Sequence, residues 1–169
     1  MSDDQTETVA FLSKPESYGL SRGEEVEQHA THGSFVFLAG DRAYKLKRAV
    51  KFPYMDYSTV ERRKAMCERE LAVNRRLAPE LYLETVPVRR GRDGALQIGQ
   101  RDGDVLDWLV VMRRFGQDDL LESRRKAGKL DARLMREVGE RLAAFHRDAE
   151  RQVGFGGAAA FVSFLDEDF

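Results

Sequence analysis

One segment, from residue 42 to residue 77, constrains the fold more than any other, because it combines a strand, a loop and a long helix. The helix is predicted from Ser58 to Leu77. Ser58 is a favourable N-cap residue, and Glu61 three positions later completes a capping box. Pro79 stops the helix soon after its last apolar residue. The preceding strand is predicted from Arg42 to Lys47.

A glutamate lies in the middle of the apolar face predicted for this helix. At about 100° per residue, Glu70 shares that face with four residues, namely Met66, Cys67, Val73 and Leu77. A carboxylate in apolar surroundings is costly unless another group pairs with it. Glu70 is therefore predicted to have a specific partner.

The strand offers that partner. Side chains alternate along a strand, so Ala43, Lys45 and Lys47 share one face. A small residue beside a lysine leaves room for a flat ring next to Ala43 and puts a cation within reach of phosphates. We therefore predict that Lys45 faces Glu70 and that the pair holds a nucleotide phosphate. The alternative is a solvated edge strand, with Glu70 bonded to a neighbouring arginine such as Arg63.

Composition indicates an ordinary globular protein. The chain has 169 residues, of which 42% are hydrophobic and 34% charged, with a net charge of −1. This balance argues against nucleic-acid binding, although short arginine clusters lie at 62–64 and 89–92. No apolar run reaches membrane-spanning length and no secretory signal opens the chain, so we expect a cytoplasmic protein. The single cysteine, Cys67, is expected to be buried and inert.

The order of elements indicates an α+β fold. Residues 1–7 are predicted to be disordered. Strands are predicted within 35–39, 43–50, 81–88, 95–98 and 105–112, with the polar segment 26–31 as a further candidate, making an antiparallel sheet of about five strands. After Arg113 the pattern becomes helical. Asp118 or Asp119 is expected to cap a helix to about Lys126, and Asp131 a longer one to about Arg151.

These elements, in this order, resemble a known family. The chain resembles the aminoglycoside phosphotransferases, which have a protein-kinase-like fold, and especially the N-terminal part of bacterial proteins that fuse such a domain to a P-loop ATPase. The resemblance covers roughly residues 25–151. Five segments carry it: 31–47, 56–63, 68–83, 110–115 and 142–146.

The resemblance implies a domain division and a set of binding residues. Residues 1–24 form a polar N-terminal segment, 25–112 a kinase-like N-lobe, 113–116 a hinge, and 117–169 the start of a helical C-lobe. Lys45 matches the lysine that contacts the phosphates of ATP, with Lys47 as second choice, and Glu70 matches the glutamate that holds this lysine. Six further residues are implied to bind the nucleotide: Ala43, Gly33, Ser34, Met112, Arg113 and Arg114. Phe115 and Asp118 are placed at the mouth of the cleft.

The resemblance also implies parts that the sequence lacks. ATP and Mg²⁺ are the implied cofactors, and the implied reaction moves the γ-phosphate of ATP to a small-molecule hydroxyl. No catalytic loop or Mg²⁺ ligands follow the second C-lobe helix, and Asp168 with Phe169 do not make the metal-binding motif. We therefore expect a truncated, inactive chain, or alternatively a non-catalytic nucleotide-binding, regulatory or docking module. Its expected partners are a P-loop ATPase, or a second copy bound through the apolar stripe Leu134, Val138, Leu142 and Phe145.

Overall fold

A computed structural model describes residues 4–150, 157 and 162, and it separates into two compact units. The first unit extends through Ser123 and the second begins at Arg124. The boundary lies eleven residues beyond Met112, where the sequence placed the end of the N-lobe. Strand β8 (Asp104–Arg113) itself takes in the first residue of the predicted hinge.

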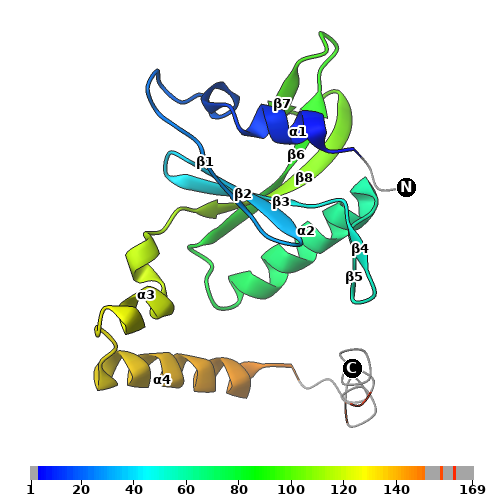
Figure 1. Ribbon diagram of the computed structural model, residues 1–169. Coiled ribbons are helices and arrows are strands. Elements are labelled where there is room, and N and C mark those ends of the chain that lie inside the picture. Colours follow the sequence, from blue (N-terminus) through cyan, green and yellow to red (C-terminus); the bar gives the residue numbers. More distant parts are fainter. Residues whose placement is uncertain (1–3, 151–156, 158–161, 163–169) are drawn as a thin grey trace. The chain divides into compact units, whose positions relative to one another are not determined.

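The first unit is built on an antiparallel sheet (Figure 1). In the described residues this sheet has six strands in the order β1-β2-β3-β8-β6-β7. Besides β8, they are β1 (Glu27–Ala30), β2 (Ser34–Ala39), β3 (Arg42–Lys47), β6 (Tyr82–Arg90) and β7 (Leu96–Ile98). The predicted α+β class with an antiparallel sheet is confirmed, with six strands where about five were predicted. Strand β1 is exposed along its whole length, so its polar sequence gives little signal, and pairing with β2 defines it.

The strand predicted at 43–50 is shorter in the structure, and a short hairpin follows it. Strand β3 ends at Lys47, and β4 (Lys51–Phe52) and β5 (Met55–Asp56) form a separate two-stranded sheet. The hairpin lies between β3 and the long helix and leads the chain into that helix.

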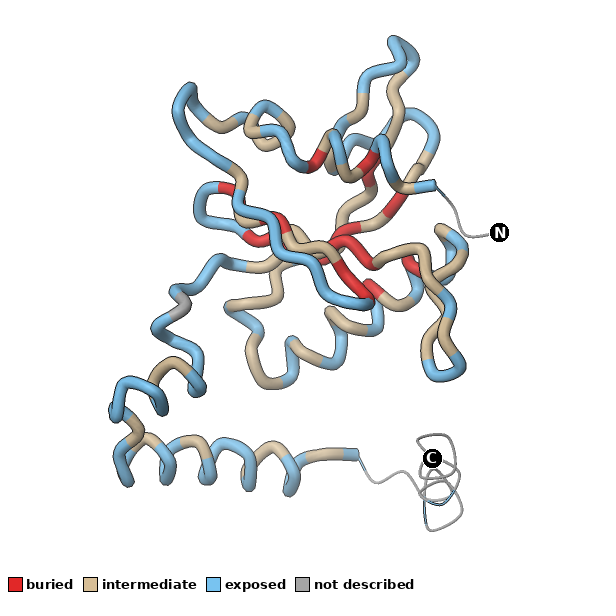
Figure 2. Tube along the Cα trace, in the orientation of Figure 1, coloured by how far each residue is buried: buried red, intermediate tan, exposed pale blue. Residues whose placement is uncertain are grey.

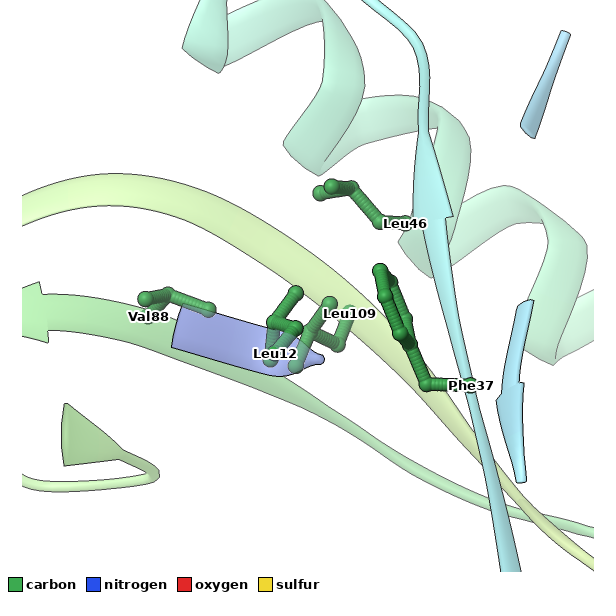
Figure 3. Packing of buried hydrophobic residues seen from close by; sticks show 5 residues of the cluster. All are labelled: Leu12, Phe37, Leu46, Val88 and Leu109. Carbon is green, nitrogen blue, oxygen red and sulfur yellow. The ribbon is translucent and has the colours of Figure 1, made fainter. Parts of the chain in front are cut away.

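The core of the unit lies between the sheet and the first helix. Helix α1 (Thr6–Leu12) contributes one fully buried side chain, Leu12, which packs with residues from four strands: Phe37, Leu46, Val88 and Leu109 (Figure 3). Buried positions concentrate on the central strands of the same region (Figure 2). A 3₁₀ helix (Pro15–Tyr18) follows α1.

The N-terminal segment is therefore part of the folded unit, so the predicted disorder is wrong for the described residues 4–7. Residues 1–3 lie outside the described part. The Gln5 amide donates to the Lys47 carbonyl at 2.9 Å and to the Asp107 carboxylate at 2.7 Å, and its oxygen accepts from the Ala49 N–H at 2.7 Å. These partners lie more than 40 residues away, which is why local sequence signals miss the ordering.

The N-cap of helix α2 (Val60–Arg75) lies one residue later than predicted. Its N-cap is Thr59, whose hydroxyl accepts from the Arg62 N–H at 3.3 Å. The predicted Ser58 cap is wrong because the Ser58 hydroxyl donates to the Asp56 carboxylate at 2.6 Å. The predicted apolar face is only partly buried, since Cys67 is fully buried but Val73 is 51% exposed.

Helices α1 and α2 lie on opposite faces of the sheet (Figure 1). Leu46 of β3 packs with Leu12 of α1, whereas its neighbour Lys45 bonds Glu70 of α2. Because neighbouring residues of a strand point to opposite faces, β3 contacts one helix on each side. Its α2 face carries the candidate site.

Short helices continue the chain across the boundary between the units. A 3₁₀ turn (Gln117–Asp119) and α3 (Leu121–Lys126) precede α4 (Ala132–Asp148). Asp131 caps α4 as predicted, accepting from the Leu134 N–H at 2.7 Å. None of the residues of α4 is buried, and Leu142 of the apolar stripe is 44% exposed. Self-association through this stripe stays a prediction.

Two further predictions concern the C-terminal part and the membrane. Helix α4 ends at Asp148, and both Arg151 and the pair Asp168 and Phe169 lie outside the described residues. Among the helices in the described part of the chain, none combines the length and apolar character that crossing a membrane requires.

Candidate functional site

Two lysines of β3 share one glutamate of α2. The ammonium group of Lys45 donates to Glu70 Oε1 at 2.8 Å, and that of Lys47 donates to Glu70 Oε2 at 2.6 Å. The predicted contact between Lys45 and Glu70 is thus present. The alternative partner for Glu70 is wrong, because Arg63 bonds Asp107 on β8 at 2.8 Å.

The three charged groups differ in their access to solvent. The Lys47 side chain is only 4% exposed, that of Glu70 is 13% exposed, and that of Lys45 is 29% exposed. The ammonium group of Lys47 also lies 5.0 Å from the centre of the Tyr57 ring, a favourable cation–π geometry. Lys47 is therefore enclosed by protein, whereas Lys45 reaches open space.

Burial and charge pairing act in opposite directions on these groups. Burial alone raises the pKa of Glu70, but the hydrogen bonds and charges of both lysines outweigh it and hold the pKa below its usual value. Burial likewise opposes the charge of Lys47, yet its bond to Glu70 raises the Lys47 pKa above the ordinary value. Glu70 and Lys47 are consequently both ionised near neutral pH. Burial raises the pKa of the adjacent Cys67 thiol to about 12, consistent with the inert, buried cysteine predicted.

A cavity of about 620 Å³ opens beside the charged cluster. Its volume lies within the range of about 300–1,000 Å³ typical of small-molecule sites. One part of its wall is charged and is made by Lys45, Lys47 and Glu70. Another part is apolar and comes from several strands and one loop: Val36, Leu38, Ala43, Leu81 and Met112.

Sheet register explains this arrangement. Ala43 pairs with Leu38 of β2 on one side and with Met112 of β8 on the other, while Lys45 pairs with Val36 and Val110. Ala43 and Lys45 are two positions apart along β3 and therefore lie on the same face of the sheet. The sheet thus presents an apolar surface next to a cation, as the predicted pairing of Ala43 and Lys45 requires.

The turn between β1 and β2 forms another part of the wall. The Thr31 hydroxyl accepts from the Ser34 N–H at 3.0 Å, and Gly33 lies against the β4–β5 hairpin. A Cβ added at Gly33 would lie 3.0 Å from Met55 Cε, closer than ordinary van der Waals contact. Met55 Cε is the end of a flexible side chain, so a shift of a few tenths of an ångström would relieve this contact.

The cavity brings together every predicted binding residue except Arg113. Lys45, Glu70, Ala43, Gly33, Ser34, Met112 and Arg114 all line it, as does Phe115. Arg113 and Asp118 are not among the described lining residues. Whether the lining residues bind a ligand stays a prediction.

The backbone of the predicted hinge is already partly used. The Arg113 N–H donates to the Leu81 carbonyl at 2.8 Å, and the Arg114 N–H donates to the Asp41 carbonyl at 2.8 Å. These two donors are therefore not free to meet a ligand in this conformation. A hinge contact to a ligand would use other backbone groups of this segment.

Several lining residues were missed by sequence reasoning. Met55 and Tyr57 belong to the hairpin region, and Leu81 and Tyr82 precede or begin β6. The sequence predicts only a loop at the hairpin, and no local pattern indicates that this segment lies against the β1–β2 turn. Lys47 was considered only as a substitute for Lys45, although their shared face was a signal that both reach Glu70.

Comparison with known proteins gives distant relatives of undefined activity. The chain is 34% identical over 126 residues to uncharacterized proteins of Mycobacterium tuberculosis and Mycobacterium bovis. The alignment covers 75% of this chain and 23% of each relative, so the chain spans about a quarter of the length of the curated relatives it matches. No protein-family model matches the chain. No solved structure matches it.

Proposed function

We propose that residues up to Ser123 form the nucleotide-binding lobe of a kinase-like phosphotransferase. The observation that carries the proposal is the bond between Lys45 and Glu70 at the wall of the 620 Å³ cavity. A lysine on a central strand, oriented by a helix glutamate beside an apolar surface, is the arrangement with which protein kinases bind ATP. The resemblance to the aminoglycoside phosphotransferases points to the same fold and use.

Each part of the cavity has a role in this proposal. The Lys45 ammonium group neutralises phosphate charge, and Glu70 orients it. The adenine ring lies against Ala43, Leu38 and Met112, which supply an apolar surface without bulky side chains at its centre. The turn at Gly33 and Ser34 covers the phosphates, and Arg114 lies at the edge of the cavity.

The described residues supply charge for the phosphates but no assigned metal ligand. Both carboxylate oxygens of Glu70 are bonded to lysines, so Glu70 does not coordinate Mg²⁺ in this arrangement. Among the residues that the structure describes, no cluster of three histidine, cysteine, aspartate or glutamate side chains is placed to hold a metal ion. We assign no residue of the chain to Mg²⁺, and the metal would arrive bound to the nucleotide phosphates.

The steps beyond nucleotide binding are proposed only for a longer protein. Transfer of the γ-phosphate to a small-molecule hydroxyl, and association with a P-loop ATPase, are proposed for a protein of the length of the relatives. Nucleotide binding is the part that the described residues themselves are proposed to perform.

Isothermal titration calorimetry with MgATP tests this part. We expect the full 169-residue chain to bind MgATP and Lys45→Ala to lose that binding. Lys14→Ala is a matched control, because Lys14 is an exposed lysine away from the cavity. Equal MgATP affinity in Lys45→Ala and the native chain would contradict the proposal.

A further inference from the structure

The second lysine of the cluster has no role in the function proposed so far. Lys47 is nearly as close to Glu70 as any hydrogen-bonded pair permits, with 2.6 Å between Nζ and Oε2. It occupies the carboxylate oxygen that Lys45 does not use. Glu70 therefore has one partner for each oxygen.

We propose that Lys47 is a positioning residue that keeps Glu70 ionised and in place, so that Lys45 is free to contact the phosphates of a nucleotide. The inference rests on the proposed function and adds a division of labour within its site. Lys47 keeps its hydrogen bond to Glu70, and Lys45 contacts the ligand.

Differences in enclosure support this division. The Lys47 side chain is 4% exposed, packs over the Tyr57 ring, and belongs to a residue whose carbonyl accepts from Gln5 at 2.9 Å. If the Lys47 ammonium group moved away from Glu70, it would be left without a counter-charge in a site with little access to water. Lys45 is 29% exposed and can turn toward the cavity without that cost.

Charge counting gives the same division. Two ammonium groups and one carboxylate leave a net charge of +1 in the cluster. Removing the charge of Lys47 would leave Lys45 as the sole partner of a half-buried carboxylate, so any move toward phosphate would break a paired charge. Removing the charge of Glu70 as well would restore the net charge of +1 and release Lys45.

Four variants of the full chain test this, with MgATP and adenosine as the titrated ligands in calorimetry. They are Lys47→Met, Glu70→Gln, Lys45→Met and the double variant Lys47→Met with Glu70→Gln. We expect Lys47→Met to weaken MgATP binding by about tenfold, a loss of about 1.4 kcal/mol. Adenosine has no phosphate, so its affinity should stay unchanged. The double variant should recover part of the MgATP affinity that Lys47→Met loses, because no carboxylate then holds the Lys45 ammonium group away from the phosphates.

Lys64 and Glu68 provide a matched control pair. They form an exposed ion pair on α2, 3.7 Å apart and away from the cavity. Lys64→Met, alone or with Glu68→Gln, should leave both affinities unchanged. A packing role of Lys47 predicts instead that the double variant is as weak as Lys47→Met or weaker.

Each outcome decides the proposal. Unchanged MgATP affinity in Lys47→Met, or no recovery in the double variant, would overturn it. If Lys47→Met does not fold, the double variant decides, because removing both members of a buried pair costs less than removing one. It should then still bind MgATP, and loss of binding would overturn the proposal. A native chain that does not bind MgATP at all would overturn the proposed function, and this inference with it.

Discussion

The guanidinium group of Arg63 is fully buried against the carboxylate of Asp107, with 2.8 Å between Nε and Oδ1. Arg63 also donates to the Tyr57 carbonyl at 3.0 Å, and Asp107 accepts from the Gln5 amide at 2.7 Å. Arg63 precedes Glu70 by seven residues, which is two helical turns, so both face the sheet. We infer that this buried network fixes the position of α2 and therefore of Glu70.

Replacing Arg63 by methionine should strongly destabilise the first unit. The change leaves the Asp107 carboxylate buried without its cationic partner, a loss on the order of 3 to 5 kcal/mol. Urea denaturation of Arg63→Met measures it. Arg62→Met is the control one residue away, because Arg62 pairs with Asp56 at the surface and its loss should cost less than about 1 kcal/mol. Similar midpoints for the two variants would contradict a structural role of the buried pair.

Removing the Glu70 side chain should also destabilise, and more than removing a glutamate from the same helix. Glu70→Ala leaves the Lys47 ammonium group enclosed without a counter-charge, which costs roughly 3 to 5 kcal/mol. Glu68→Ala removes only an exposed pair with Lys64, worth less than about 1 kcal/mol. Thermal melting compares the two. An equally small shift in both would mean that Glu70 is solvated in solution.

The contribution of Glu70 should depend on pH. Its pKa in the folded protein lies below its ordinary value of 4.5, so its charge stabilises the fold above that pH. The contribution is lost as pH falls through the folded pKa. We expect the gap in unfolding free energy between the native chain and Glu70→Gln to be constant from about pH 7 to about pH 5.5, and to shrink below 4.5. A gap that widens on acidification would contradict the pairing.

The raised pKa of Lys47 has the opposite consequence. Its charge contributes stability below its ordinary pKa of 10.5, and the contribution is lost only as pH rises through the higher folded value. The cluster should therefore stabilise the fold across the neutral range and lose this contribution at both acidic and alkaline pH. Urea denaturation at alkaline pH measures the loss on the alkaline side, as a shrinking difference in unfolding free energy between the native chain and Glu70→Gln.

Local periodicity was sufficient to predict the central pair. Alternation along β3 put Ala43, Lys45 and Lys47 on one face, and the spacing of α2 put Glu70 toward the sheet. These patterns repeat within a few residues, so they can be recognised from the sequence alone. The α+β class and the antiparallel sheet followed from the same kind of signal.

Features that depend on distant contacts were missed. Gln5 is ordered by Lys47, Ala49 and Asp107, and no local pattern predicts those bonds. Arg63 lies on the buried face of α2 because Asp107 arrives from β8, 44 residues away in the chain. The N-cap is Thr59 and not the predicted Ser58, because the Ser58 hydroxyl donates its hydrogen bond to the Asp56 carboxylate.

The most direct test of the nucleotide site is the methyl NMR spectrum of the chain labelled at methionine, recorded during titration with ADP. Met55 and Met112 line the cavity, whereas Met66 and Met135 do not and serve as internal controls. We predict that the Met55 and Met112 resonances shift in a saturable way while those of Met66 and Met135 stay in place. Resonances that do not move, or that shift equally at all four positions, would contradict nucleotide binding beside Lys45 and Glu70.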